Sequence, residues 1–502
     1  MSQIRVSNLT FGYEGSFDHI FENVSFSIDS SWKLGFIGRN GKGKSTFLNL
    51  LMGKYEYEGT ISAQPLFDYF PYEIPIEKMS LPAAEFVEEL KENSELWRVY
   101  VELDKLQTDS EIMFRPFQTL SFGERTKILL AVLFSGENDF LLIDEPTNHL
   151  DAESREIIKR YLASKKGFIL VSHDRDLLDA CIDHVLVLNR STIEVQTGTF
   201  SSWWENKVKK DAFAIAENEK HIREINKLNE SARRVQGWSE KNENSKIGFD
   251  PIKEHDRCLS TRSYIGAKTK KMQARVKQME KRIQTEIEEK EGLLQDIERI
   301  VDLRLNLLKH HKDVLVHAYK YGLRYADREK MLFADKTFDL VQGDRLVLKG
   351  VNGCGKSSLI KAILGNKDKL EETGELATAA GLEISYICQD TSHLHGDIHT
   401  FCLNEKLDES LFCSILRQLD MGREQFSKNM ENYSEGQKKK VLIAASLLKP
   451  AHLFIWDEPL NYIDIFSRIQ IENLILQYQP TMLIVEHDVQ FCEKISTKTI
   501  CL

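Results

Sequence analysis

The chain has 502 residues, enough for two to four domains, and its 42% hydrophobic and 29% charged residues suit a protein with buried cores and a water-facing surface. No apolar run approaches the roughly 18 residues that a membrane span needs, and the N-terminus leads straight into a strand-like stretch, so we expect no membrane segment and no secretory signal. The eight cysteines show no CxxC pair and no metal-ligand spacing, which favours reduced thiols in a cytosolic protein. The net charge of −10 argues against a uniformly basic surface.

The first chemical motif follows an apolar strand at residues 34–37. The sequence from Gly38 to Ser45 reads GRNGKGKS and leads into a predicted helix over 46–52. A GxxxxGK(S/T) loop between a strand and a helix is typical of a phosphate-binding loop, whose glycines let backbone N–H groups approach the phosphates. In this loop we expect Lys44 to reach the β and γ phosphates and the hydroxyl of Ser45 to ligate Mg²⁺.

Three further features follow along the first half. Residues 73–112 are acidic and favour helices over 81–90 and 95–106, which indicates an inserted helical arm. Residues 120–124 read LSFGE and open another helix. An apolar strand over 140–143 then ends in Asp144 and Glu145, and a second strand over 168–171 ends close to His173.

The middle of the chain, residues 201–312, carries none of these motifs. Apolar residues recur at helical spacing in two sets, which predicts two long helices packed against each other, each about 60 Å long at 1.5 Å per residue. The sets are Ile215, Ile222, Ile225, Leu228, Ala232 and Val235, then Met272, Val276, Met279, Ile283 and Ile287. We therefore expect a projecting antiparallel hairpin.

Two parts of this hairpin are candidates for contact with a partner. Between its helices lies a tip at about 245–263, where Lys246, Ile247 and Phe249 either meet a surface or simply staple the helix ends. From Arg262 to Arg282 there are eight Lys or Arg residues against one acid, either a footprint for a phosphate backbone or a solvated helix face.

After the hairpin the first set of motifs returns. The second phosphate loop runs from Gly350 to Ser357, and SEGQ, DEP and HD motifs follow in the same order as before. The offsets between matching residues are 312 for the loop lysines, 313 for the serines, 313 for the aspartates and 314 for the histidines. Four motifs in step to within two residues indicate a tandem duplication.

The residue types at these positions predict the chemistry of phosphoryl transfer. Asp144 and Asp457 can hold Mg²⁺ through water, and the neighbouring Glu145 and Glu458 can polarise the attacking water. The two histidines, His173 and His487, can sense the γ-phosphate. The serines and glycines of the SxG motifs offer hydroxyl and amide groups at helix starts, which favours anion binding.

These paired motifs resemble those of ATP-binding-cassette proteins, and the hairpin link resembles the ABC-F branch of cytosolic, ribosome-associated ATPases. The likeness extends to its Lsa-like antibiotic-resistance members. It implies an α/β fold class with two tandem nucleotide-binding domains, at 1–200 and 313–502, joined by the helical hairpin at 201–312. It also implies two composite ATP sites, because each signature motif completes the site of the opposite half: Lys44 shares an ATP with Ser434, and Lys356 with Ser121.

The nucleotide-contacting residues that the resemblance implies fall into four groups. The first loop supplies Gly38, Asn40, Gly41, Gly43, Lys44, Ser45 and Thr46, and the second Gly350, Asn352, Gly353, Gly355, Lys356, Ser357 and Ser358. The signatures supply Ser121, Gly123, Glu124, Ser434, Gly436 and Gln437. Tyr13 and Tyr325 stack on adenine, unless they are ordinary core residues. The metal ligands are Ser45, Asp144, Ser357, Gln389 and Asp457.

The two halves depart from each other in two places. The glutamine expected before the helical subdomain is Gln389 in the second half, but the first half has Tyr72 there, which casts doubt on Mg²⁺ contact from this loop. The sequences TNHLD at 147–151 and LNYID at 460–464 also differ. We therefore expect unequal hydrolysis at the two sites.

The family further implies an ATPase that needs ATP and Mg²⁺, binds the ribosomal E-site and places its linker near the peptidyl-transferase centre. By likeness, its tip protects against lincosamides, pleuromutilins and streptogramin A. A housekeeping translation factor would share every ATPase motif. A transporter subunit would need a membrane partner, and a repair-type ATPase would carry its coiled coil between the loop and the signature, an interval of only 77 residues here.

Overall fold

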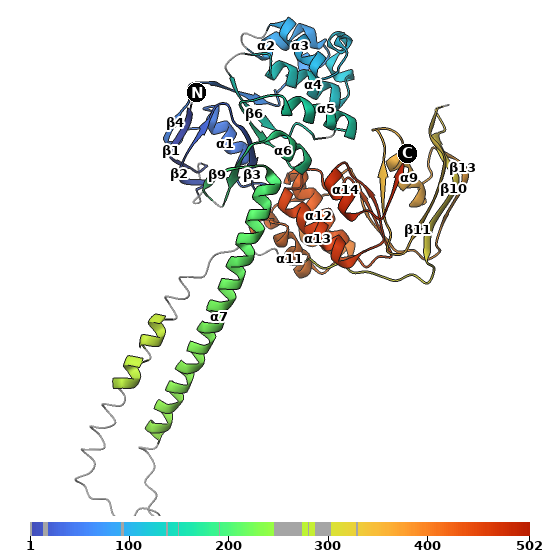
Figure 1. Ribbon diagram of the computed structural model, residues 1–502. Helices are drawn as coiled ribbons and strands as arrows, with labels where there is room; N and C mark the ends of the chain where they lie inside the picture. Colours follow the sequence, from blue (N-terminus) through green and yellow to red (C-terminus); the bar gives the residue numbers. More distant parts are fainter. Residues whose placement is uncertain are drawn as a thin grey trace, which may run out of the picture. The chain divides into compact units, whose positions relative to one another are not determined.

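The computed structural model describes residues 3–13, 19–91, 95–136, 139–148, 150–189, 191–244, 274–279, 281–286, 303–327 and 330–502. The chain divides into two units (Figure 1). Unit 1 combines Met1–Trp203 with Ile300–Leu502 and so contains both sequence repeats, which we call the first and second halves. Unit 2 is Trp204–Arg299. The tip residues Lys246, Ile247 and Phe249 lie outside the described residues, as does most of the basic run.

The first half is built on two sheets. An antiparallel sheet has the order β2 (Phe21–Asp29), β1 (Gln3–Phe11) and β4 (Glu58–Ser62). A six-stranded sheet has the order β5 (Leu66–Phe70), β6 (Asp139–Asp144), β7 (Phe168–Val171), β3 (Lys33–Ile37), β8 (His184–Leu188) and β9 (Ile193–Thr197). All of its neighbouring strands are parallel except β8 and β9.

The second half repeats this order. Its antiparallel sheet is β11 (Met331–Val341), β10 (Val314–Tyr325) and β13 (Leu370–Thr378). Its parallel sheet is β14 (Ile384–Ile387), β15 (Leu453–Asp457), β16 (Met482–Val485), β12 (Arg345–Lys349) and β17 (Lys498–Cys501). The prediction of two tandem α/β domains is confirmed, with the addition that each half carries a separate antiparallel sheet.

The central strands read as continuous apolar runs because both of their faces are covered, one by helices and the other by a helix together with the antiparallel sheet. Every residue of β7, β15 and β16 is buried. The helices over these sheets are α1 (Lys44–Leu51), α4 (Phe122–Leu133), α5 (Ala152–Ala163) and α6 (Arg175–Cys181) in the first half. The second half has α9 (Lys356–Ile363), α12 (Glu435–Leu448), α13 (Ile465–Tyr478) and α14 (Val489–Ile495).

A small helical subdomain follows the edge strand in each half. In the second half it contains α10 (Ile398–Glu405) and α11 (Glu409–Gln418). In the first half α3 (Leu96–Lys105) forms where a helix is predicted, but the helix predicted over 81–90 is reduced to a 3₁₀ turn, Ala83–Glu85, and the short α2 (Val87–Leu90). Pro82 starts the turn, and Phe86 leaves helical geometry at φ −129° while its side chain is buried.

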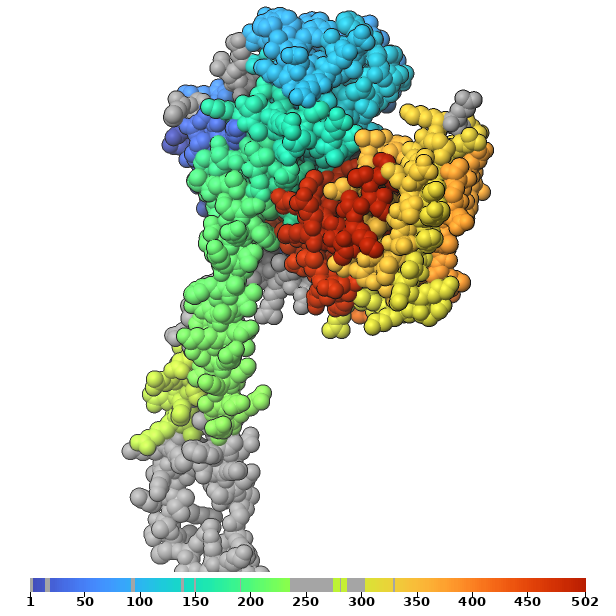
Figure 2. Space-filling model, turned by 45° about the vertical axis from the view of Figure 1, so that its right-hand side comes forward, coloured from blue at the N-terminus to red at the C-terminus, as the bar shows by residue number. Residues whose placement is uncertain are grey.

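The two halves of unit 1 contact each other directly. The buried guanidinium of Arg175 on α6 donates to Glu472 on α13 at 2.8 Å. Asn40 of the first half donates through Nδ2 to the backbone oxygen of Tyr462 at 2.7 Å. On the face drawn in Figure 2, blue-green residues of the first half lie beside red residues of the second half.

Unit 2 begins in α7 (Phe200–Asn244), a single helix of 45 residues that starts in unit 1. Residues 274–279 and 281–286 are helical as well. Ile225 and Ile283 are 8% and 7% exposed and form one apolar cluster with Leu228 and Ala232. These contacts agree with the predicted helix pair at the described positions, and the complete hairpin stays a prediction. Across the part of the chain that the structure describes, no helix combines the length and apolar character needed to cross a membrane.

Candidate functional site

Each phosphate loop joins the first strand of its parallel sheet to a helix, β3 to α1 and β12 to α9. The residue before each helix is a glycine in the left-handed region, Gly43 at φ 107° and Gly355 at φ 104°. A Cβ at Gly43 would lie 2.5 Å from Ile20, and one at Gly355 would lie 3.0 Å from Leu332. Glycine is therefore required at this position on both conformational and steric grounds.

The loop lysines lie at equivalent positions. Lys44 donates through Nζ to the backbone oxygens of Gly38 and Arg39 at 2.7 and 3.1 Å. Lys356 makes the same pair of bonds, to Gly350 at 2.8 Å and Val351 at 3.1 Å. Both ammonium groups thus lie against the backbone of their own loop, and their contact with the β and γ phosphates stays a prediction. We call the surroundings of Lys44 the first site and those of Lys356 the second site.

The predicted metal ligands meet at the end of β6. Ser45 donates to Oδ2 of Asp144 at 2.8 Å, and Tyr69 donates to the same oxygen at 3.1 Å. Burial raises the pKa of Asp144, and the two hydrogen bonds act in the opposite direction. In the second half, Oδ1 of the buried Asp457 has no hydrogen-bond partner among the described residues. A buried carboxylate oxygen in that state is a suitable ligand for a cation or its bound water.

The glutamates that follow these aspartates adopt a backbone conformation that is rare for non-glycine residues. Glu145 has φ 50° and Glu458 has φ 49°. Their N–H groups still continue the sheet, donating to Val171 and Val485 at 2.9 Å. The left-handed turn comes directly after the last strand residue, and residues in such conformations concentrate at functional sites.

Glu145 sits beside the histidine of its own half. Nε2 of His173 lies 3.3 Å from Oε1 of Glu145. Burial, with the neighbouring charge of Asp144, raises the pKa of Glu145 to about 8. Burial also lowers the pKa of His173 well below its ordinary value, and the positive charge of Lys44 adds to this effect, so the imidazole is neutral.

Glu458 has a richer set of donors. Gln389 donates through Nε2 to Oε2 at 2.9 Å, and Asn461 donates to the same oxygen at 2.8 Å. Nε2 of His487 lies 3.6 Å from Oε1. Burial raises the pKa of Glu458, but the interaction with His487 and the charge of Lys356 outweigh it, so the pKa is lower than usual.

The strand registers locate the first-half counterpart of Gln389. Tyr69 pairs with Leu142 in one sheet and Tyr386 with Ile455 in the other, so Tyr72 and Gln389 stand at the same distance beyond the strand end. Tyr72 donates to Oδ2 of Asp68 at 2.6 Å. The first half therefore has the phenol of Tyr72, bonded to Asp68, at this position. The second half has the amide of Gln389, bonded to Glu458.

The tyrosines expected to stack on adenine lie next to the phosphate-loop helices. The hydroxyl of Tyr13 is 2.9 Å from Oγ1 of Thr46, and that of Tyr325 is 3.0 Å from Oγ of Ser358. The Tyr13 side chain is 46% exposed, which contradicts the alternative that it is a core residue. Stacking on adenine stays a prediction.

Both signature motifs form capping boxes at helix starts. Ser121 accepts from the N–H of Glu124, whose side chain accepts from the N–H of Ser121, and Ser434 with Gln437 repeats the arrangement. A Cβ at Gly123 would lie 3.0 Å from Ser154, and one at Gly436 would lie 2.6 Å from the Tyr462 oxygen, so both glycines allow close packing next to residues 147–151 and 460–464. We call these two segments the D-loops.

A cavity of about 660 Å³ brings the two halves together at the second site. The second half contributes the phosphate loop, with Asn352, Gly353, Gly355, Lys356, Ser357 and Ser358, together with Tyr325, Gln389, Glu458 and His487. The first half contributes Phe122 from its signature and Arg155 from α5. Lys356 and Phe122 of the opposite half thus line one space, and the predicted sharing of one ATP by Lys356 and Ser121 stays a prediction.

The first site also meets the opposite half. Asn40 bonds to the D-loop residue Tyr462, as described above, and Arg39 lies 3.7 Å from the carboxylate of Asp420. Asp464, at the end of the same D-loop, forms a buried ion pair with Lys440 of the signature helix at 3.2 Å.

Sequence reasoning missed several residues that the fold brings to these sites: Phe122, Tyr69, Arg155, Arg468 and Asn461. Arg155 and Arg468 each come four residues after the last D-loop aspartate, so a search of the repeat for matching cations would have found them. Asn461 repeats Asn148, so a comparison of the two D-loops could also have found it. Phe122 has Glu435 at its matching position, and only the structure places Phe122 at the cavity.

Comparison with known proteins agrees with the duplicated nucleotide site. A family model described as ABC transporter matches residues 21–148 and 333–461. The ribosome protection protein VmlR of Bacillus subtilis is 27% identical, over 98% of this chain and 85% of that protein. The ATP-binding protein Uup of Buchnera aphidicola is 26% identical, over 99% of this chain and 80% of that protein.

A solved structure shares the fold. The archaeal ribosome recycling factor aABCE1, in complex with the archaeal ribosomal stalk protein aP1, aligns with a TM-score of 0.62 at 16% identity. The alignment covers 98% of this chain and 87% of that chain.

Proposed function

We propose, from the premise that this chain belongs to the ABC transporter family of ATP-binding proteins, that it is an ABC-F-type ATPase acting on the ribosome in the cytoplasm. The observation that carries the proposal is the pair of equivalent phosphate-binding sites in one chain, separated by the long helix α7. The near full-length match to a ribosome protection protein supports it.

The residues at both sites fit ATP and Mg²⁺. The glycine loops leave room for phosphates against backbone N–H groups, and Ser45 with Asp144, or Ser357 with Asp457, offers the hard oxygen ligands that Mg²⁺ prefers. When bound, Mg²⁺ neutralises phosphate charge. The glutamates then orient and deprotonate water, and the histidine beside each can donate to the γ-phosphate.

We place the partner contact in unit 2. A hairpin carrying a basic run suits an RNA backbone, because the cations release counterions when they meet phosphates. In this proposal the protein works as a monomer, its two halves close around ATP, and the hairpin reaches from the E-site towards the peptidyl-transferase centre. The tip residues Lys246, Ile247 and Phe249 then displace rRNA bases or drug and protect against lincosamides, pleuromutilins and streptogramin A, as an Lsa-like protein would.

A housekeeping role in translation is the second candidate, because the match to Uup is almost as extensive as the match to VmlR. Deletion of the gene separates the two. Lower drug resistance in the deletion strain supports ribosome protection, and unchanged susceptibility together with a growth or translation defect supports the housekeeping role.

The ATPase and ribosome proposal is tested with Glu145→Gln and Glu458→Gln together. Each change keeps the shape of the side chain but removes the carboxylate, so ATP should stay bound without hydrolysis. We expect the double variant to accumulate on ribosomes in the presence of ATP. The control is Lys44→Ala with Lys356→Ala, which should bind ATP weakly and stay off the ribosome. Hydrolysis at the parental rate by the double glutamine variant would contradict the assigned roles.

The tip is tested with Lys246→Ala, Ile247→Ala and Phe249→Ala, made singly. Stacking of an aromatic side chain on a base contributes about 1–3 kcal/mol, which corresponds to roughly a ten- to hundredfold change in drug affinity. We expect lost protection with normal protein level and ribosome binding. Full protection in all three variants would remove the tip from the mechanism.

A further inference from the structure

Two arginines stand at equivalent places in the two halves, outside the motifs that bind nucleotide. Arg155 is the fourth residue of α5 and Arg468 is the fourth residue of α13. Each follows its D-loop directly, because Asp151 and Asp464 cap the two helices.

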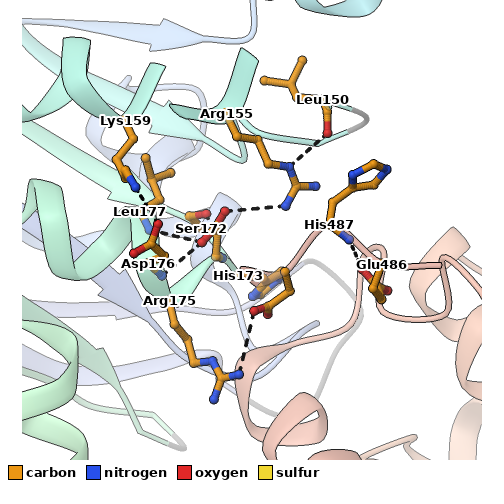
Figure 3. Close-up of polar contacts among 12 residues, drawn as sticks. Leu150, Arg155, Lys159, Ser172, His173, Arg175, Asp176, Leu177, Glu486 and His487 are labelled. Carbon is orange, nitrogen blue, oxygen red and sulfur yellow. Dashed lines mark hydrogen bonds and ion pairs between the residues drawn. The ribbon is translucent and has the colours of Figure 1, made fainter. Parts of the chain in front are cut away.

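Arg155 joins two loops of the first half. Its Nε donates to the backbone oxygen of Leu150 in the D-loop at 3.0 Å. Its Nη1 lies 3.6 Å from Oδ2 of Asp174, the residue that follows His173 and caps α6. Residues 172–174 and 486–488 are called the switch loops below. The side chain of Arg155 thus spans the D-loop and the switch loop of its own half (Figure 3).

The same side chain also faces the opposite half. Arg155 lines the second-site cavity together with Lys356, Glu458 and His487. Figure 3 shows it and His487 approaching each other from the two halves. A cation at this wall of the cavity would interact with the negative charge of a triphosphate bound by Lys356.

Arg468 repeats these contacts in the second half. Its Nε donates to Ile463 at 2.9 Å and its Nη2 to Leu460 at 3.0 Å, both in the second D-loop. Its Nη1 donates to Oδ2 of Asp488, next to His487 in the second switch loop, at 3.2 Å. Its positive charge also reaches the first site, where it contributes to lowering the pKa of His173.

We propose that Arg155 and Arg468 are reciprocal positioning residues that couple the two ATP sites. Arg155 lines the site of the opposite half. Arg468 holds the D-loop whose Tyr462 accepts a hydrogen bond from Asn40 of the first site. Each guanidinium also holds the switch loop of its own half. ATP bound at the second site attracts the guanidinium of Arg155 and so weakens or strengthens its hold on the first switch loop. ATP bound at the first site acts in the same way through Arg468 on the second switch loop. Turnover at one site then depends on occupancy of the other. This inference rests on the proposed ATPase function.

The physical basis is a competition for one cation. In the structure Arg155 is shared between a carbonyl oxygen and the carboxylate of Asp174. A triphosphate adds a stronger anion to the same neighbourhood, so the arginine contacts differ between the empty and filled second site. Any ligand that binds two such states differently shifts the equilibrium between them. Coupling between sites is typically worth about 5- to 150-fold in affinity.

Variants in which only one of the two sites can hydrolyse ATP distinguish coupling from a purely structural role of Arg155. Glu458→Gln leaves hydrolysis to the first site alone, and Glu145→Gln leaves it to the second. We would place Arg155→Gln in each background and measure kcat and KM for ATP. The coupling predicts two effects: a higher KM at the second site, and a kcat at the first site altered about tenfold at saturating ATP. Arg468→Gln should give the mirror-image result.

The control is Arg160→Gln, an exposed arginine on the same helix that pairs with Glu156, and it should leave both sites unchanged. Arg155→Lys keeps the charge without the forked geometry, so it should restore KM at the second site but not the first-site kcat. It also serves if Arg155→Gln fails to fold in a melting experiment.

The outcomes are distinct. An effect confined to the second site would make Arg155 a simple nucleotide contact and overturn the coupling. An equal loss at both sites in step with lower thermal stability, not restored by lysine, would make it a structural staple and also overturn it. Absence of ATPase activity in the parental protein would overturn the proposed function instead.

Discussion

At the scale of single residues, the two glutamates proposed to activate water share a backbone conformation but differ in their surroundings. Both turn out of a strand in the left-handed region, so their carboxylates are aimed alike. Glu145 is buried beside Asp144, which raises its pKa to about 8. Glu458 interacts with His487 and with the charge of Lys356, which hold its pKa below the usual value. The two sites should therefore respond differently to pH.

We predict that first-site turnover rises as the pH increases through about 8, whereas second-site turnover keeps its maximum to a lower pH. A general base works in its ionised form, and that form is gained as pH rises through the pKa. One pH unit below its pKa a carboxyl is only about a tenth ionised. The measurement is the pH profile of ATP hydrolysis by Glu458→Gln, which reports the first site, and by Glu145→Gln, which reports the second. Superimposable profiles would contradict the prediction.

At the scale of helices and strands, α7 is held to the return segment by a narrow apolar contact. Ile225 and Ile283 are its buried members, and Leu228 and Ala232 pack beside them. Neighbouring apolar residues of α7 such as Phe213 are largely exposed. Within the described part of the pair, this cluster joins the two segments, so truncating one of its buried side chains should loosen them there.

Ile225→Ala should loosen the pairing of the two helices by about 2 kcal/mol, at the low end for truncation of a buried isoleucine. Phe213→Ala is the control, because Phe213 is 69% exposed. Hydrogen exchange of residues 274–286 is the measurement: we expect faster exchange in Ile225→Ala and no change in the control. Equal exchange in both would show that this contact does not hold the pair together.

The basic run gives a second prediction at this scale. If residues 262–282 follow an RNA backbone, ribosome binding should weaken steeply as salt rises. Charge reversal at Lys270, Lys271 and Arg275 should weaken it further while ATPase activity without ribosomes persists. Co-sedimentation with ribosomes at several salt concentrations is the measurement, and unaltered binding would assign the run to a solvated helix face.

The sequence predicts the elements of unit 1 well because each motif stands directly after a continuous apolar run, which marks a buried strand. The motif at Asp144 recurs at Asp457, and the strand order of the first half recurs in the second half. Contacts between the halves are not visible in the same way. Arg175 and Glu472 stand 297 residues apart and belong to no repeat, since the matching residues are Val489 and Lys159. Likewise, the shortened helix at 81–90 follows from burial of Phe86, which a helical pattern does not reveal.

At the scale of the whole molecule, this pair makes the junction of the halves unsymmetrical. Arg175 and Glu472 are 4% and 1% exposed, and Glu472 also accepts from Lys494 at 2.6 Å. On the mirror-image side, Lys159 pairs with Asp176 of its own half. At one edge of the junction, Arg175 and Glu472 form a buried ion pair between the two halves. At the other edge, Lys159 forms an ion pair within the first half.

Glu472→Gln should destabilise the junction by up to about 3–5 kcal/mol, because the buried Arg175 loses its carboxylate partner at 2.8 Å and keeps only the more distant Asp488, at 3.9 Å. Replacing both partners, Arg175→Met with Glu472→Leu, should restore much of the loss. Denaturant unfolding of the three proteins measures this double-mutant comparison. Lys159→Met, on the opposite edge, is the matched control and should have a smaller effect. Equal losses for Glu472→Gln and the double variant would show that the ion pair does not connect the halves energetically.

The anchoring of α7 has a mechanical consequence. Trp203, in its first turn, is buried, and its ring lies 6.3 Å from that of Phe466, which is on α13 next to the second D-loop. From this first turn, the 45 residues of the helix extend about 68 Å at 1.5 Å per residue. A tilt of about 5° at the first turn would displace the far end by about 6 Å, nearly two base steps of about 3.4 Å along a nucleic-acid strand. The length of the helix therefore converts a small tilt at its first turn into a displacement of several ångströms at its far end.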